Sequence, residues 1–100
     1  MLVDDARRIA AAIEERLNAG TCQEVKTTVR SDEMRPKSVP AGAGRPTFIS
    51  YFIEIADGTR MASLTLGQAA GLLDDVEPDW DPDRLFEAIR ALDVPVENIN

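Results

Sequence analysis

The stretch TFISYFIEIADGTRMASL, residues 47–64, decides the fold because it contains two β-prone runs separated by a tight-turn dipeptide. Its first run is rich in β-branched and aromatic residues, which favour strands. Asp57-Gly58 is typical of a two-residue turn between antiparallel strands. With these two residues as the turn, Ile53 lies opposite Ala62. The stretch therefore predicts a β-hairpin at the centre of the sheet.

Side chains alternate between the two faces of a strand, so the predicted hairpin has two faces of different composition. The first face is apolar and is expected to support helices: Ile49, Tyr51, Ile53, Ile55, Ala62 and Leu64. The second face is mixed and carries Phe48, Phe52 and Met61 beside polar residues. Aromatic residues and methionine are enriched in interface cores, so these three are predicted to form a partner-binding or dimer face. The alternative is that the preceding strand or loop folds over them.

The residues before the hairpin predict a helix, a strand and a long loop. Apolar residues recur every three or four positions from residue 2 to 17, which indicates an amphipathic helix with Gly20 as a left-handed stop. Residues 22–31 alternate with period two and predict a half-exposed strand. Residues 32–46 contain three prolines and two glycines and predict a long loop. Its basic residues are candidate contacts for a partner: Arg35, Lys37 and Arg45.

The residues after the hairpin predict two further helices. Thr65 and Gln68 have the spacing of a capping box, so a helix should run from there to about Leu73. Another helix is expected to begin at Pro82 and to end before Pro95. Residues 94–100 are either a tail or a short edge strand. The prediction is one α+β domain over residues 1–100, in the order α-β-β-β-α-α, with a three-stranded antiparallel sheet and helices packed mainly on one face.

The composition limits the classes of function. No apolar run approaches the roughly 20 residues of a membrane span, so a cytoplasmic protein without membrane contact is expected. The chain has no histidine and only one cysteine, Cys22, so the usual zinc sites and histidine-dependent catalytic groups cannot form within it. Neither a metal nor a cofactor is expected. The net charge of −7 disfavours general binding to phosphate backbones.

The segment DDVEPDWDPDRLFE, residues 74–87, contains seven carboxylates that need an explanation. The spacing of Asp79, Asp81 and Asp83 imitates the first ligands of a calcium loop. The sixth position of that loop requires glycine for a sharp turn, and here it is Arg84. The sequence therefore disfavours a calcium site.

A helix start explains the second half of this segment. Asp81 can cap the helix, Pro82 takes the first helical position, and Asp83 faces the positive end of the helix dipole. Trp80 and Leu85 have the spacing of a hydrophobic staple. The four carboxylates before Trp80 are predicted to form an acidic partner-binding surface: Asp74, Asp75, Glu77 and Asp79.

No catalytic residue is predicted. Glu54 is a carboxylate within an apolar strand and is interpreted as an edge or solvent-facing residue. Cys22 has no candidate base beyond Lys26, so it is interpreted as a small buried residue. These interpretations predict a protein that is not an enzyme.

The expected function is that of a small acidic protein-binding module. Its partner would be another protein, and a partner with a basic surface would suit the acidic segment. A bacterial or phage inhibitor, immunity protein or anti-defence protein would fit this description. The alternative is an assembly protein that homodimerises through the hairpin face. A third hypothesis, nucleic-acid binding through the basic loop at residues 30–45, has the least support because aromatic residues are not interleaved with the basic ones.

Overall fold

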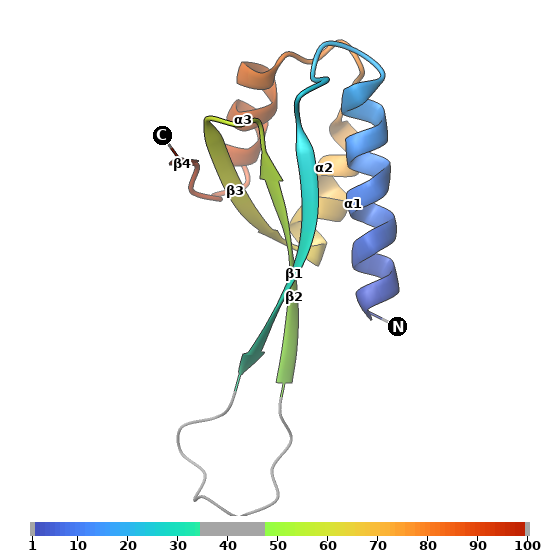
Figure 1. Ribbon diagram of the computed structural model, residues 1–100, viewed down its shortest axis with the longest axis vertical. Helices are drawn as coiled ribbons and strands as arrows, with labels where there is room; N and C mark the ends of the chain where they lie inside the picture. The colour runs from blue at the N-terminus through green and yellow to red at the C-terminus, as the bar shows by residue number, and fades with distance from the viewer. Residues whose placement is uncertain (1, 35–47, 100) are drawn as a thin grey trace, which may run out of the picture.

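The computed structural model describes residues 2–34 and 48–99, which form an α+β domain with three helices and a four-stranded antiparallel sheet (Figure 1). The elements are α1 (Leu2–Asn18), β1 (Lys26–Met34), β2 (Phe48–Ala56), β3 (Arg60–Thr65), α2 (Leu66–Asp75), α3 (Pro82–Arg90) and β4 (Glu97–Asn98). The strands lie in the order β1-β2-β3-β4. The α+β class is confirmed, whereas the prediction of three strands is wrong by one.

The additional strand, β4, comes from the C-terminal residues that the sequence left as a tail or an edge strand. Glu97 pairs with Met61, and Asn98 pairs with Arg60. The backbone N–H of Ile99 also donates to the carbonyl of Thr59 at 2.9 Å. The open edge of β3 thus gains a partner from the end of the chain.

The register of the central hairpin differs by two residues from the prediction. Ile53 lies opposite Leu64 rather than Ala62, because Gly58 and Thr59 occupy the turn. Gly58 has φ +94°, a conformation that glycine adopts without steric cost. A shift of two residues preserves the face of every side chain, so the predicted division into two faces is unchanged.

Strand β1 begins later and ends later than predicted. It covers residues 26–34 rather than 22–31, so the first residues of the predicted loop belong to a strand. Pairing with β2 explains this extension, since Lys26 lies opposite Ala56 and Met34 opposite Phe48. The other predicted loop residues, 35–46, lie outside the described residues.

The paired ends of β1 and β2 extend beyond β3 and away from the helices (Figure 1). The pairing of β2 with β3 stops at Phe52 opposite Thr65. Ile49 is consequently 52% exposed, although it was expected on the helix-covered face. The expectation was wrong because the side-chain alternation continues along β2 past the point where the helices end.

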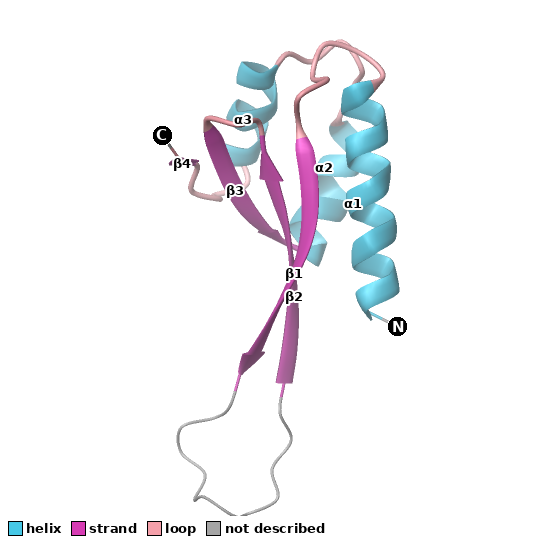
Figure 2. Cartoon of the chain, in the orientation of Figure 1, coloured by secondary structure: helices cyan, strands magenta, loops and turns pink. Residues whose placement is uncertain are grey.

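The three described helices cover one face of the sheet (Figure 2). Residues Ile53, Ile55 and Leu64 of that face are fully buried. They form one cluster with apolar side chains from all three helices, including Leu17, Leu72 and Phe86. Burying side chains of this size contributes roughly 1.5–3 kcal/mol each, so this face supplies most of the hydrophobic stabilisation.

The helix ends follow the local sequence signals, with one exception. Both halves of the capping box at Thr65 and Gln68 are present, as predicted. Gly20, in contrast, is not in the left-handed conformation. A Cβ atom at this position would lie 1.6 Å from the carbonyl oxygen of Pro78. Glycine is therefore required for close approach of two loops, and the prediction of a left-handed stop is wrong.

No helix in the described part of the chain is long and apolar enough to cross a membrane.

Candidate functional site

The second half of the acidic segment builds the start of α3, as the sequence predicted. The Asp81 side chain accepts a hydrogen bond from the Arg84 backbone N–H at 2.7 Å, and Pro82 occupies the first turn. Trp80 and Leu85 are both buried in the core cluster. These residues are accounted for by folding alone.

Asp83 has a further structural role, which the sequence did not reveal. Its carboxylate lies 2.9 Å from the guanidinium of Arg60, which also pairs with Asp57 at 3.0 Å. The same guanidinium lies 4.7 Å from the ring centroid of Phe86. This network joins the first turn of α3 to the hairpin turn.

Asp57 is held in its charged form within this network. Burial alone would raise its pKa, but hydrogen bonds from the backbone N–H groups of Thr59 and Arg60 outweigh burial and lower the pKa below 3.8. The side chain of Arg60 also donates to it. A negative Asp57 therefore stabilises the hairpin turn at neutral pH.

The first half of the acidic segment has no comparable structural role. Asp74, Asp75, Glu77 and Asp79 are all exposed. None of them forms an ion pair with any residue in the described part of the chain. Their charge is therefore available to a partner.

Two of these carboxylates are also placed unfavourably. Asp74 and Asp75 are the last two residues of α2, which has no basic residue in its last turn. The C-terminal end of a helix carries partial negative charge, so carboxylates there are repelled. Arg16 of α1 offsets part of this repulsion, because its guanidinium donates to the Leu73 carbonyl at 2.8 Å.

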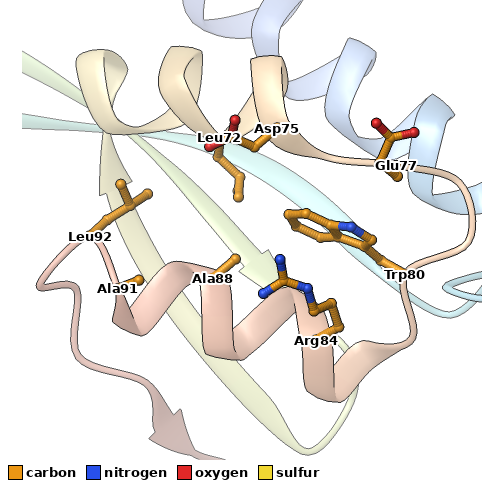
Figure 3. Close-up of a pocket in the computed structure, with 8 residues that line it drawn as sticks. All are labelled: Leu72, Asp75, Glu77, Trp80, Arg84, Ala88, Ala91 and Leu92. Atoms are coloured by element: carbon orange, nitrogen blue, oxygen red, sulfur yellow. The ribbon is translucent and has the colours of Figure 1, made fainter.

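A groove of about 490 Å³ lies beside these carboxylates, between α2 and α3 (Figure 3). Its lining consists of Leu72, Asp75, Glu77, Trp80, Arg84, Ala88, Ala91 and Leu92. Asp74 and Asp79 are outside this lining. The structure thus brings half of the predicted acidic surface to an apolar depression.

Trp80 is the aromatic wall of the groove, and neighbouring residues fix its position. Its backbone carbonyl accepts hydrogen bonds from the Thr21 hydroxyl and, at 3.0 Å, from the Cys22 thiol. The guanidinium of Arg84 lies 4.8 Å from the ring centroid, one helical turn along the chain. The four-residue spacing of Trp80 and Arg84 was the sequence signal for this contact, and the sequence reasoning did not use it.

The predicted hairpin face is the second candidate site. Phe52 and Met61 are half-buried, and neither belongs to the core cluster or to the residues packed against it. Arg30 lies 5.9 Å from the ring centroid of Phe52 and 3.3 Å from the carboxylate of Glu54. Phe48 occupies β2 opposite Met34, but its side chain lies outside the described residues.

The prediction that Glu54 faces solvent needs correction, because its side chain is only 21% exposed and is paired with Arg30. The hydroxyl of Ser63, opposite Glu54, is buried and has no hydrogen-bond partner within the described part of the chain. This face is therefore partly covered by its own long side chains. Among the described residues, no helix packs against it (Figure 2).

The remaining predicted contacts, Arg35, Lys37 and Arg45, lie outside the described residues. The hypothesis of nucleic-acid binding through this loop therefore stays a prediction.

Cys22 is buried, in line with its interpretation as a small buried residue. Burial raises the pKa of the Cys22 thiol above its ordinary value, and the nearby Asp81 carboxylate raises it further. Because the thiolate is the reactive form, Cys22 is a weak nucleophile at neutral pH. Residues 2–34 and 48–99 contain no group of three side chains suited to hold a metal ion.

Comparisons with protein-family models, with curated proteins and with solved structures found no match.

Proposed function

We propose that the protein is a small, acidic, non-catalytic protein-binding module and that the surface at the α2–α3 connection contacts its partner. The observation that supports this proposal is the placement of Asp74 and Asp75 at the C-terminal end of α2 without an ion pair among the described residues. Residues that weaken local structure often serve function instead.

The charge distribution supports a partner with a basic surface. Exposed charges of one sign accelerate encounter with an oppositely charged protein and contribute to specificity. A basic surface that normally binds nucleic acid or another acidic protein could be occupied in this way. The protein would then act as an inhibitor, an immunity protein or an anti-defence protein of a bacterium or phage.

A pull-down from the lysate of the source cell, at low and at high salt, tests this proposal. The test variant neutralises Asp74, Asp75, Glu77 and Asp79 to the matching amides. We expect this variant to capture no partner. For the wild type, we expect high salt to weaken binding of the partner, because salt screens exposed charges.

A matched control separates the site from the overall charge. The control variant neutralises four exposed carboxylates that lie outside the groove and form no ion pair among the described residues: Glu15, Glu24, Glu87 and Glu97. Both variants lower the net charge from −7 to −3. Equal capture by both variants would contradict the proposal.

Homodimerisation through the hairpin face is a second candidate function. Phe52 and Met61 support it, because both are outside the core on a face that no described helix covers. We expect light scattering at high micromolar concentration to detect a dimer that Phe52→Glu dissociates. Monomeric wild type at that concentration would exclude this function.

A further inference from the structure

We propose that the groove between α2 and α3 binds a basic, amphipathic segment of a partner protein. An apolar side chain of that segment would occupy the groove, and its lysine or arginine side chains would pair with the rim. This inference rests on the proposed function and adds the chemistry of the occupant.

The apolar walls of the groove suit a side chain from outside. Leu92 is half-buried and Ala91 is exposed, so both offer surface to an occupant, whereas Leu72 and Trp80 expose only 2% and 9% of their surface. Ala88 of α3 and Ala91, the residue that caps its C-terminal end, have the smallest side chains in the lining. Figure 3 shows Leu72 and Trp80 on one side of the groove and these alanines on the other. The short side chains allow the backbone of an occupant to come close to α3.

The charges of the rim favour a basic occupant. Asp75 and Glu77 line the side that belongs to α2 and the following loop, and Arg84 is the only cation that the described residues contribute to the lining. The guanidinium of Arg84 lies over the indole of Trp80, whose ring face attracts it. Neither Asp75 nor Glu77 is paired with a cation among the described residues. An incoming lysine or arginine therefore meets a net negative rim.

The groove contains a built-in reporter, because Trp80 is the only tryptophan in the chain. The experiment titrates the full-length protein with a short, tryptophan-free peptide of lysine, leucine and alanine, patterned as an amphipathic helix. Two comparison peptides replace all lysines by glutamate or all leucines by serine. We expect only the lysine–leucine peptide to shift the Trp80 fluorescence at micromolar concentration.

Two variants separate the contribution of the groove from that of its rim. Ala91→Phe fills the groove without changing its charge, and we expect it to lower the affinity for the lysine–leucine peptide at least tenfold. The double variant Asp75→Asn and Glu77→Gln should lower the affinity for the peptide about fivefold, as expected for the loss of two exposed ion pairs. It should also reduce the dependence of peptide binding on salt. Ala11→Phe, at an exposed position of α1, is the control and should leave binding unchanged. Ala91→Leu replaces Ala91→Phe if thermal unfolding shows that the larger side chain disturbs folding.

The outcomes distinguish this inference from the proposed function. Absence of binding by the lysine–leucine peptide, stronger binding of the glutamate peptide through Arg84, or binding unaffected by Ala91→Phe would each overturn the occupant proposed here. In those cases, carboxylate-dependent capture of a partner from lysate would still support a protein-binding function. Failure of the wild type to capture a partner, or capture that does not depend on these carboxylates, would instead contradict the proposed function.

Discussion

The two halves of the acidic segment, residues 74–79 and 80–87, are adjacent in sequence and both acidic, but their carboxylates differ in energetic effect. Asp81 and Asp83 lie at the N-terminal end of α3, where one caps the helix and the other pairs with Arg60. Asp74 and Asp75 lie at the C-terminal end of α2 and have no such partner among the described residues. A carboxylate therefore stabilises the N-terminal end of α3 but destabilises the C-terminal end of α2. The reason is that a helix carries partial positive charge at its N-terminal end and partial negative charge at its C-terminal end.

The largest effect is expected at Trp80, the first residue of the second half. Trp80→Ala removes a buried aromatic side chain and should lower the free energy of unfolding by about 3 kcal/mol. Urea denaturation, followed by far-ultraviolet circular dichroism, measures the change. Trp80→Phe should cost less because it retains an aromatic ring. A negligible loss for Trp80→Ala would show that the indole serves the groove and not the core.

The N-terminal cap of α3 comes next. Asp81→Ala removes the acceptor for the Arg84 N–H and should lower the free energy of unfolding by about 1 kcal/mol. Asp81→Ser retains a capping oxygen and should preserve most of the stability. Equal free energies of unfolding for the alanine and serine variants in chemical denaturation would contradict a capping role for Asp81.

Acid should weaken the network to which Asp83 belongs. The folded-state pKa of Asp57 is lowered, so its contribution to stability is fully present above the unfolded value of 3.8 and is lost as pH falls through the lower folded value. Thermal unfolding between neutral pH and acid measures this loss. Asp57→Asn should be less stable at neutral pH, and its stability should decline less in acid. If the stability of wild type and variant declined equally as the pH falls, Asp57 would not be charged in the folded protein.

The smallest effect has the opposite sign. Asp74→Asn and Asp75→Asn should each raise the free energy of unfolding by about 0.5 kcal/mol, since each removes a negative charge from the C-terminal end of α2. Chemical denaturation at low ionic strength gives the greatest sensitivity. Asp74→Glu is the control, because it retains the charge and should not stabilise. Destabilisation by both amides would show that these carboxylates have a structural role.

Much of the fold could be predicted because its signals are local. The caps at Thr65 and Asp81 depend on residues three positions apart, and both are present as predicted. The division of the hairpin into two faces also survived, although the register shifted, because alternation has a period of two. The exposure of Ile49 could not be predicted, since it depends on how far the helices extend beneath β2.

The candidate site could be predicted only in part. Asp75 and Glu77 were predicted as partner-binding residues because helix capping does not explain their carboxylates, and both line the groove. The opposite wall comes from Ala88 of α3 and from Ala91, its C-cap, and nothing in their local sequence indicates what faces them. The groove exists because the fold places residues of α2 and α3 around Trp80, and that placement is not a local property.

The sequence by itself determined the element types, the helix caps, the concentration of negative charge near the C-terminus and the absence of histidine chemistry. These properties follow from composition and from residues within one helical turn of each other. Only the tertiary structure decided that β4 pairs with β3, that Gly20 meets Pro78, and that the end of α2 faces Trp80 and α3. The physical reason is that such contacts join residues distant in the chain, and they form only when burial of the common core brings the elements together.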